Sequence, residues 1–292
     1  MKRFIFACAL TMMGSAFAQA STILTSIKPI QLITLELTQG ISEPGVLLES
    51  NTSPHDYALK PSDVKRVRNA DLVIWFGDDL EPFLSKILHE QSNVLTLSEI
   101  EGLALREFGG EHEHHDGHDH GSHDPHFWLG YQPTLQVAQT ITQQLQQIDS
   151  ENAKQYQANL TQFESQLAAQ QEAFKTQLAP VSEAGYYVFH DAYGYFEQDF
   201  PLNHLGYFTV SPDRKPGAKT LISIRKALAN QDAKCVFSEP QFTPAVVQSV
   251  VRGSDANTDV LDPIGSDVKV EQGGYFQLKQ NLADSFSRCL SQ

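Results

Sequence analysis

A histidine-rich tract lies near the middle of the chain, between residues 111 and 126. It holds most of the 11 histidines: His112, His114, His115, His118, His120, His123 and His126. Acidic residues and glycines separate them, and both neutral imidazole and carboxylate are ligands of zinc. A purification tag is the alternative interpretation, but the tract is internal and leads directly into the apolar residues 127–129. The composition therefore predicts metal binding.

Four other positions predict a second kind of metal site. His55 follows the apolar run VLLES, His190 ends YYVFH, Asp262 ends TDVLD, and His126 closes the histidine-rich tract. In open parallel sheets, ligands bind beyond the carboxyl ends of the strands, so these side chains would converge. Three imidazoles and a carboxylate suit zinc. Taken singly, each has another explanation, namely a capped surface histidine or, before Pro263, an aspartate that forms a turn.

The elements that must position these residues alternate between strand and helix. Predicted strands cover 22–27, 46–49, 72–76 and 94–97, then 186–189, 207–210, 235–238 and 259–261. Predicted helices cover 30–38, 62–69 and 82–89, then 218–229 and 244–252. This alternation predicts parallel sheets covered on both faces. We expect two similar α/β domains, at 21–149 with a histidine-rich loop at 111–124, and at 180–292.

One long helix is expected to join the two domains, over residues 150–179. The segment from Ser150 to Leu178 contains no glycine or proline, and its apolar residues recur at three- and four-residue steps. Such a helix would be about 43 Å long. A coiled-coil arm for dimerisation is the alternative. The single apolar stripe, with a gap near Gln170 and Gln171, favours packing across two domains of a monomer.

The first twenty residues have the pattern of a secretory signal peptide. Lys2 and Arg3 precede an apolar stretch, and small residues at 16–20 offer a cleavage site. Cleavage after Ala20 would leave 292 − 20 = 272 residues. The apolar stretch is too short to span a membrane, and no later apolar run has spanning length. The pattern predicts an exported protein.

Two cysteines, Cys235 and Cys289, remain after that cleavage. An even pair in an oxidising compartment favours a disulfide. It would stabilise the fold by about 4 kcal/mol in the chain-entropy model and pin the C-terminal segment to a buried strand. A pair of metal ligands is the alternative, although the CxxC spacing common in such sites is missing.

The net charge of the chain excludes some partners. It is −14 at pH 7, and removal of Lys2 and Arg3 with the signal peptide would give −14 − 2 = −16. An acidic surface repels nucleic acid and anionic membranes and attracts cations. We therefore expect no nucleic-acid partner.

Long segments of the chain resemble the zinc-uptake periplasmic binding proteins of ABC importers. The resemblance rests on SPHDYALKPSDVKRVRNADLVIWFG, DPHFWL, GYYVFHDAYGYFEQDF, CVFSEPQFTPAVVQSVVRG and LDPIG. It implies two (β/α) domains joined by one rigid helix, a Zn²⁺ ion in the cleft between them, and a membrane permease as partner. His55, His126 and His190 match the family's three histidine ligands.

The same resemblance leaves the fourth ligand open. Asp262 matches the carboxylate of metal-receptor relatives, but Pro54 stands where some relatives have glutamate, so the fourth ligand is Asp262 or water. Glu239 is expected to hold a ligand imidazole from behind. Cys235 and Cys289 match the family's disulfide.

The expected function is a periplasmic receptor that captures Zn²⁺ for an importer and catalyses no reaction. The histidine-rich loop would collect zinc weakly. A zinc hydrolase is one alternative; it would need an open coordination position and a general base, with Glu239 or Asp191 as candidates, and no HExxH motif is present. A surface adhesin or metal-storage protein of the same fold is another.

Overall fold

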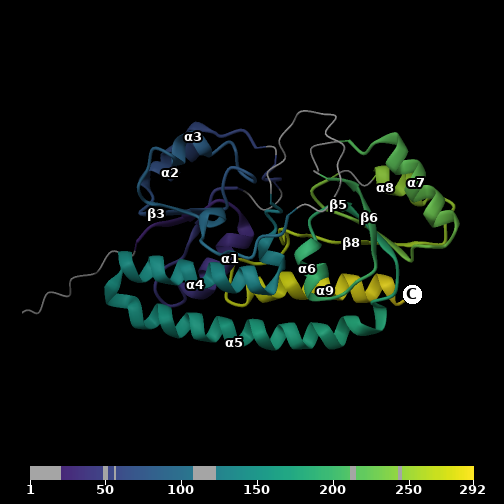
Figure 1. Ribbon diagram of the computed structural model, residues 1–292. Coiled ribbons are helices and arrows are strands. Elements are labelled where there is room, and N and C mark those ends of the chain that lie inside the picture. The colour runs from purple at the N-terminus through teal and green to yellow at the C-terminus, as the bar shows by residue number, and fades with distance from the viewer. Residues whose placement is uncertain (1–20, 49–51, 56, 108–122, 211–214, 243–244) are drawn as a thin grey trace, which may run out of the picture.

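The computed structural model describes residues 21–48, 52–55, 57–107, 123–210, 215–242 and 245–292. Their strands form two parallel four-stranded sheets, one in each half of the chain. The first has the order β2-β1-β3-β4, from β1 (Ile23–Thr25), β2 (Gly45–Val46), β3 (Leu72–Trp75) and β4 (Val94–Thr96). The second has the order β6-β5-β7-β8, from β5 (Tyr186–His190), β6 (His204–Thr209), β7 (Cys235–Ser238) and β8 (Asn257–Val260). The predicted α/β class is confirmed (Figure 1).

The helices of the two halves flank these sheets. They are α1 (Lys28–Leu37), α2 (Pro61–Asn69) and α3 (Ser85–Leu88) in the first half, and α6 (Gly194–Asp199), α7 (Ala218–Ala229) and α8 (Ala245–Val251) in the second. The sequence predicted most of them closely, and 218–229 matches α7 residue for residue. The segment 82–89 forms only the short helix α3.

Strand β6 begins three residues earlier than the sequence predicted. Its register against β5 shifts at Tyr186 and Tyr187, and Gly206 has a φ of 145°. A glycine in a strand commonly marks such an irregularity, and it hid the start of this strand from pattern reasoning.

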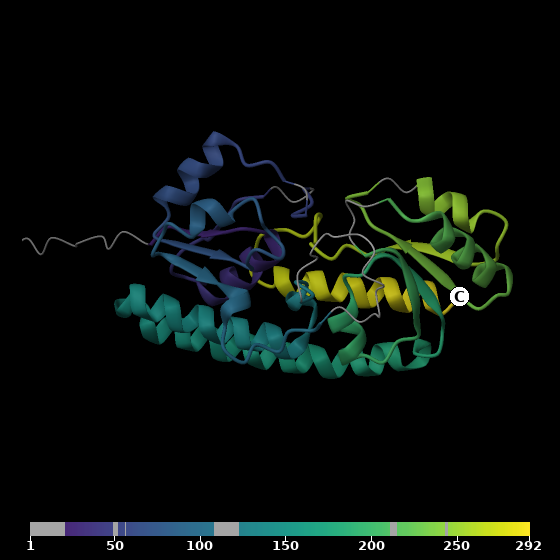
Figure 2. The same ribbon diagram turned by 45° about the horizontal axis from the view of Figure 1, so that its top comes forward.

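Three helices lie along one side of the molecule: α4 (Tyr131–Ile148) under the first half, α5 (Ala153–Leu178) under both halves, and α9 (Gly274–Leu290) under the second half (Figures 1 and 2). The sequence pattern predicted α5, whereas α4 and α9 lie in segments for which no helix was predicted. Helix α5 has 26 residues and is therefore about 39 Å long. In the gap of its apolar stripe, Gln170 donates a hydrogen bond to the carbonyl of Phe276 in α9 (2.8 Å). The stripe faces the body of the protein, as predicted for a linking helix.

The core continues through both halves. One cluster of buried apolar side chains includes Leu24 and Ile74 of the first sheet, Phe163 of α5, and Phe237 and Phe286 of the second half. A smaller cluster, with Phe189 and Val236, covers the other face of the second sheet. The shared core packs the two halves against each other and against α5. Within the described residues, no helix is long and apolar enough to cross a bilayer.

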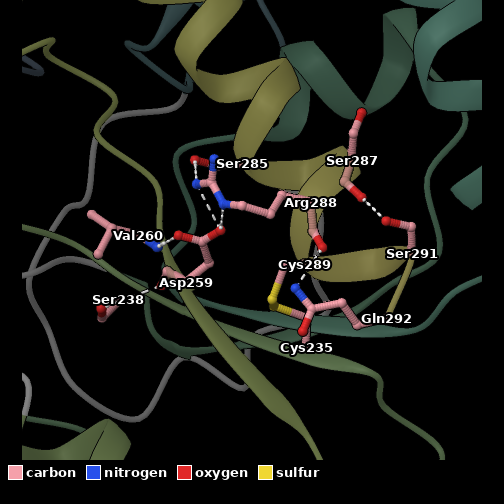
Figure 3. The surroundings of a disulfide bond; sticks show 10 residues. All are labelled: Cys235, Ser238, Asp259, Val260, Ser285, Ser287, Arg288, Cys289, Ser291 and Gln292. Carbon is pink, nitrogen blue, oxygen red and sulfur yellow. Dashed lines mark hydrogen bonds and ion pairs between the residues drawn. A yellow bond between two sulfur atoms is a disulfide. The ribbon is translucent and has the colours of Figure 1, made fainter.

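A disulfide joins Cys235 to Cys289, and the two Cα atoms are 5.9 Å apart (Figure 3). Cys235 begins β7 and Cys289 lies in the last turn of α9. The predicted bridge is confirmed, and it fixes the end of the C-terminal helix to the second sheet.

Candidate metal centre

Three histidines from different parts of the fold meet between the two sheets. Each of His55, His126 and His190 offers one ring nitrogen, and these nitrogens lie within 4.8 Å of one another. The ring centroids are 5.2 Å apart for His126 and His190, and 5.8 and 5.9 Å from His55 to each of them. His126 and His190 are buried, while His55 is half-buried. Among the described residues, no other group of this kind occurs.

The second sheet positions His190. It is the last residue of β5, a strand flanked by β6 and β7, and the whole strand is buried. Its carboxyl end points toward the other half, as expected for ligands of open parallel sheets. His55 comes from the loop after β2, and its backbone N–H donates to the hydroxyl of Ser53 (3.3 Å).

The turn that follows His126 is anchored to the C-terminal part of the chain. Residues Phe127–Leu129 form one turn of 3₁₀ helix. The Trp128 indole donates to the carbonyl of Pro263 (2.7 Å), and the Tyr275 hydroxyl donates to the carbonyl of Trp128 (2.7 Å). The buried ammonium of Lys279 donates to the carbonyl of Leu129. These bonds fix His126 relative to the second half of the chain.

Two carboxylates hold two of the rings from behind. Nδ1 of His126 lies 2.7 Å from Oδ1 of Asp124, and Nδ1 of His190 lies 2.7 Å from Oε1 of Glu239. An ionised carboxylate only accepts hydrogen bonds, so each Nδ1 carries the proton and each Nε2 presents a lone pair. The sequence predicted this contact for Glu239 and missed it for Asp124. The two-residue spacing in Asp124-Pro125-His126 was the available signal.

The two free nitrogens face each other across the centre. Nε2 of His126 lies 3.3 Å from Nε2 of His190. Two Zn–N bonds of about 2.0–2.1 Å at a tetrahedral angle would place their nitrogens about 3.3–3.4 Å apart. The donor set and this spacing fit zinc.

The protonation of His55 also suits a metal ligand. Burial, together with the nearby rings of His126 and His190, lowers the pKa of His55 well below its usual range. Its imidazole is therefore neutral at pH 7, which is the state that binds a metal ion.

The structure does not bring Asp262 into this group. Its carboxylate accepts hydrogen bonds from the backbone N–H groups of Ile264 (3.3 Å), Gly265 (3.1 Å) and Ser266 (2.5 Å). The side-chain amide of Gln241 donates to it as well (2.7 Å). The expectation that Asp262 approaches the three histidines therefore differs from the structure, because the turn after β8 engages both of its oxygens.

The space beside the histidines is small. The cavity has a volume of about 20 Å³, and its apolar lining includes Pro54, Trp128, Phe242 and Ile264. A cavity of roughly 10–15 Å³ already holds one water molecule. There is room beside the rings for an ion or a water molecule.

The other predicted ligands divide between described and undescribed residues. His112, His114, His115, His118 and His120 lie outside the described residues. His123 pairs with Glu107 in an isolated antiparallel bridge at the base of the tract. Cys235 and Cys289 form the disulfide and are not metal ligands.

Known proteins match this chain over nearly its whole length. A family model described as "Zinc-uptake complex component A periplasmic" matches residues 23–289. The high-affinity zinc uptake system protein ZnuA of Yersinia pestis is 38% identical over 310 residues, covering 99% of this chain and 98% of that protein. The corresponding protein of Haemophilus ducreyi is 39% identical over 302 residues, covering 97% of each.

Solved structures share the fold. A ZnuA crystal structure is 24% identical and has a TM-score of 0.76 over 92% of this chain and 100% of its own. A laminin-binding adhesin of Streptococcus agalactiae is 20% identical, with a TM-score of 0.79 over 92% of this chain and 99% of its own. At these identities the likeness concerns the fold alone.

Proposed function

The chain belongs to the ZnuA family of periplasmic zinc-uptake components, and we propose that it binds its zinc through His55, His126 and His190. It is a periplasmic receptor that captures Zn²⁺ and delivers it to an ABC importer, and it is not an enzyme. Zinc is its cargo, so the site must bind the ion tightly and also release it intact.

The observation that carries this proposal is the pair of facing nitrogens. Asp124 and Glu239 direct the Nε2 lone pairs of His126 and His190 toward each other at 3.3 Å. Two lone pairs repel at this distance, and a cation between them converts the repulsion into two bonds. Three neutral imidazoles favour zinc over manganese, which prefers carboxylate and water. A water molecule completes the coordination, since Asp262 is engaged by its own turn.

The remaining parts of the proposal follow from the sequence. Residues 1–20 direct export, and the mature chain acts as a monomer that docks on the membrane permease. The division into domains at 21–149 and 180–292 with a linking segment at 150–179 belongs to the same proposal. The histidines of the tract between 111 and 124 collect zinc weakly.

Neither alternative function is favoured. A zinc hydrolase does not agree with the relatives, which are zinc-uptake components. It also needs a free base, whereas Glu239 holds His190 and Asp191 lies near Arg106. The adhesin likeness concerns the fold alone at 20% identity.

Metal analysis and competition titration test the proposal. We expect chelator-treated protein that is reloaded with zinc and desalted to retain at least one tightly held ion per chain. Alanine at His55, His126 or His190 should weaken that binding by orders of magnitude, because each change removes one bond of three. His89→Ala is the matched control, since His89 is exposed and lies outside the group. Wild-type affinity in any of the three variants would remove that residue from the site.

A further inference from the structure

We infer that Arg106 is a positioning residue for zinc binding, which acts on His126 through Asp124 and ties that carboxylate to the other half of the chain. The inference rests on the proposed zinc site. Arg106 has no place in the sequence motifs considered above, and it does not belong to the group of three histidines.

The contacts of Arg106 begin with Asp124. Nη1 of Arg106 donates to Oδ2 of Asp124 (2.8 Å), while Oδ1 of the same carboxylate accepts from Nδ1 of His126 (2.7 Å). Asp124 has no solvent-exposed area, so neither oxygen has an alternative partner in bulk water. The backbone N–H of His126 also donates to Oδ1 (3.0 Å). Together these bonds hold the carboxylate in a single orientation, and Arg106 is the side chain that engages Oδ2.

The backbone strengthens this connection. The N–H of Asp124 donates to the carbonyl of Arg106 (2.7 Å). The N–H of Arg106 donates to the hydroxyl of Tyr195 (2.8 Å), and that hydroxyl donates to the carbonyl of Asp124 (2.7 Å). Arg106 and Asp124 are thus joined through main chain and side chain at once.

Arg106 also reaches the half that carries His190. Nη1 lies 3.6 Å from Oδ1 of Asp191, the residue after His190. The guanidinium lies against Gly194, where any side-chain carbon would collide with it. Glycine at this position makes room for the guanidinium. One cation therefore sits between the carboxylate that orients His126 and the acid beside His190.

This arrangement defines what Arg106 does for zinc. The facing Nε2 atoms of His126 and His190 have a fixed spacing only if both rings are held, and they belong to segments 64 residues apart in the sequence. Nη1 makes both contacts, and the rest of the planar guanidinium fills the space at Gly194, which the smaller ammonium of lysine does less well. Loss of partners that orient ligands commonly weakens metal affinity by about 10–100-fold. Arg106 contacts the partner Asp124 and not the ligand His126 itself, so we expect a loss of affinity at the lower end of this range.

The experiment compares R106Q, R106K and D124A in the full chain. Zinc affinity is measured by chelator competition, and Co²⁺ is used as a spectroscopic probe of ligand geometry. We expect R106Q to lower the affinity for zinc by about tenfold and to alter the absorption spectrum of bound Co²⁺. R106K keeps the charge and should recover only part of the affinity. The double variant R106Q/D124A should bind no more weakly than D124A, because Arg106 acts through Asp124.

R288Q is the matched control. Arg288 pairs with Asp259 at 2.7 Å near the disulfide (Figure 3). Its loss removes an arginine–aspartate pair with no contact to the three histidines, so affinity and spectrum should not change. Wild-type affinity and spectrum in R106Q would overturn the inference, as would tighter binding or full additivity with D124A. If the wild-type protein did not bind zinc tightly, the proposed function itself would be contradicted.

Discussion

At the scale of single residues, the site depends on which atoms are already engaged. Asp124 and Glu239 occupy the Nδ1 atoms of His126 and His190, so only the Nε2 atoms are free. The carboxylate of Asp262 is occupied by its own turn. Hydrogen bonding thus distinguishes the three proposed histidine ligands from Asp262, which the sequence had placed beside them.

Asp262→Ala should therefore affect stability more than zinc binding. The change leaves the N–H groups of Ile264 and Ser266 without their acceptor, and we expect a loss of about 1–3 kcal/mol in unfolding free energy. Zinc affinity should fall less than in any of the three histidine variants. Urea unfolding and chelator competition on the same preparation measure both effects. A loss of affinity equal to that of His190→Ala would restore Asp262 as a ligand.

Glu81 should give the protein a distinct pH dependence of stability. Its burial raises the pKa to about 7, against hydrogen bonds from the N–H groups of Gly77 and Phe76 that lower it. The folded protein keeps the proton up to about pH 7, whereas the unfolded chain releases it above the ordinary glutamate pKa of 4.5. The contribution of Glu81 to the free energy of unfolding is therefore fully present below pH 4.5 and is lost as the pH rises through 7.

Glu81→Gln should remove that part of the pH dependence, on the order of 3 kcal/mol between pH 4.5 and 8. Urea unfolding across this range, with metal removed, measures the difference between wild type and variant. The exposed Glu90→Gln is the control. Burial also raises the pKa of Glu36 to about 7, so some slope should persist in the variant. Parallel stability curves for wild type and Glu81→Gln would contradict the assignment.

At the scale of elements, the histidines of the centre belong to segments that the fold holds in place. His190 ends a buried strand, and the turn after His126 is bonded to α9 and to the turn after β8. Binding to such side chains requires little further ordering. A charged, glycine-containing segment loses much conformational entropy when a metal orders it, so its sites should be weaker.

Deletion of residues 111–122 should therefore remove weak zinc binding and leave the tight phase intact. This deletion keeps His123, Asp124 and His126, and with them the bond between Asp124 and His126. Calorimetric titration of the full chain should show more than one zinc-binding phase, and the deletion only the tight one. If the deletion lost the tight phase and kept the weak one, the roles of tract and centre would be reversed.

At the scale of the whole molecule, the long helices make the two halves one body. Helix α5 runs along both halves, and α9 lies along the second half (Figures 1 and 2). The start of α9 reaches the first half, where the N–H of Gly273 donates to Glu36 of α1 (2.6 Å), and the core is continuous between the halves. The disulfide fastens the end of α9 to β7. It lies at the start of that strand, whereas Glu239 follows its other end. Its effect should therefore be on global stability and not on the metal centre.

Replacing both cysteines, as Cys235→Ser with Cys289→Ser, should lower the unfolding free energy by about 4 kcal/mol in the chain-entropy model. The reason is the separation of 54 residues that the bridge closes in the unfolded chain. Denaturant unfolding of the metal-free protein measures the loss. Zinc affinity of the folded variant should equal that of wild type. An unchanged unfolding free energy would show that packing of α9 alone holds the C-terminus.

The sequence by itself was enough to predict the class of fold, the linking helix and which three histidines come together. Strand and helix periodicity are local properties, so 218–229 and the long α5 could be predicted closely. His55 and His190 follow strand-like segments, and parallel sheets place such residues at one edge. The even cysteine pair was also enough to predict the disulfide.

Only the tertiary structure decided the surroundings of these residues. The carboxylate of Asp262 accepts hydrogen bonds from its own turn, and Asp124 bonds to the ring of His126. Arg106 lies close to both Asp124 and Asp191. Hydrogen bonding of a polar side chain depends on which donors come within about 3 Å, and those donors lie far apart in the chain. Residue type and spacing therefore identified the histidines that meet, while three-dimensional packing determined which carboxylates hold them.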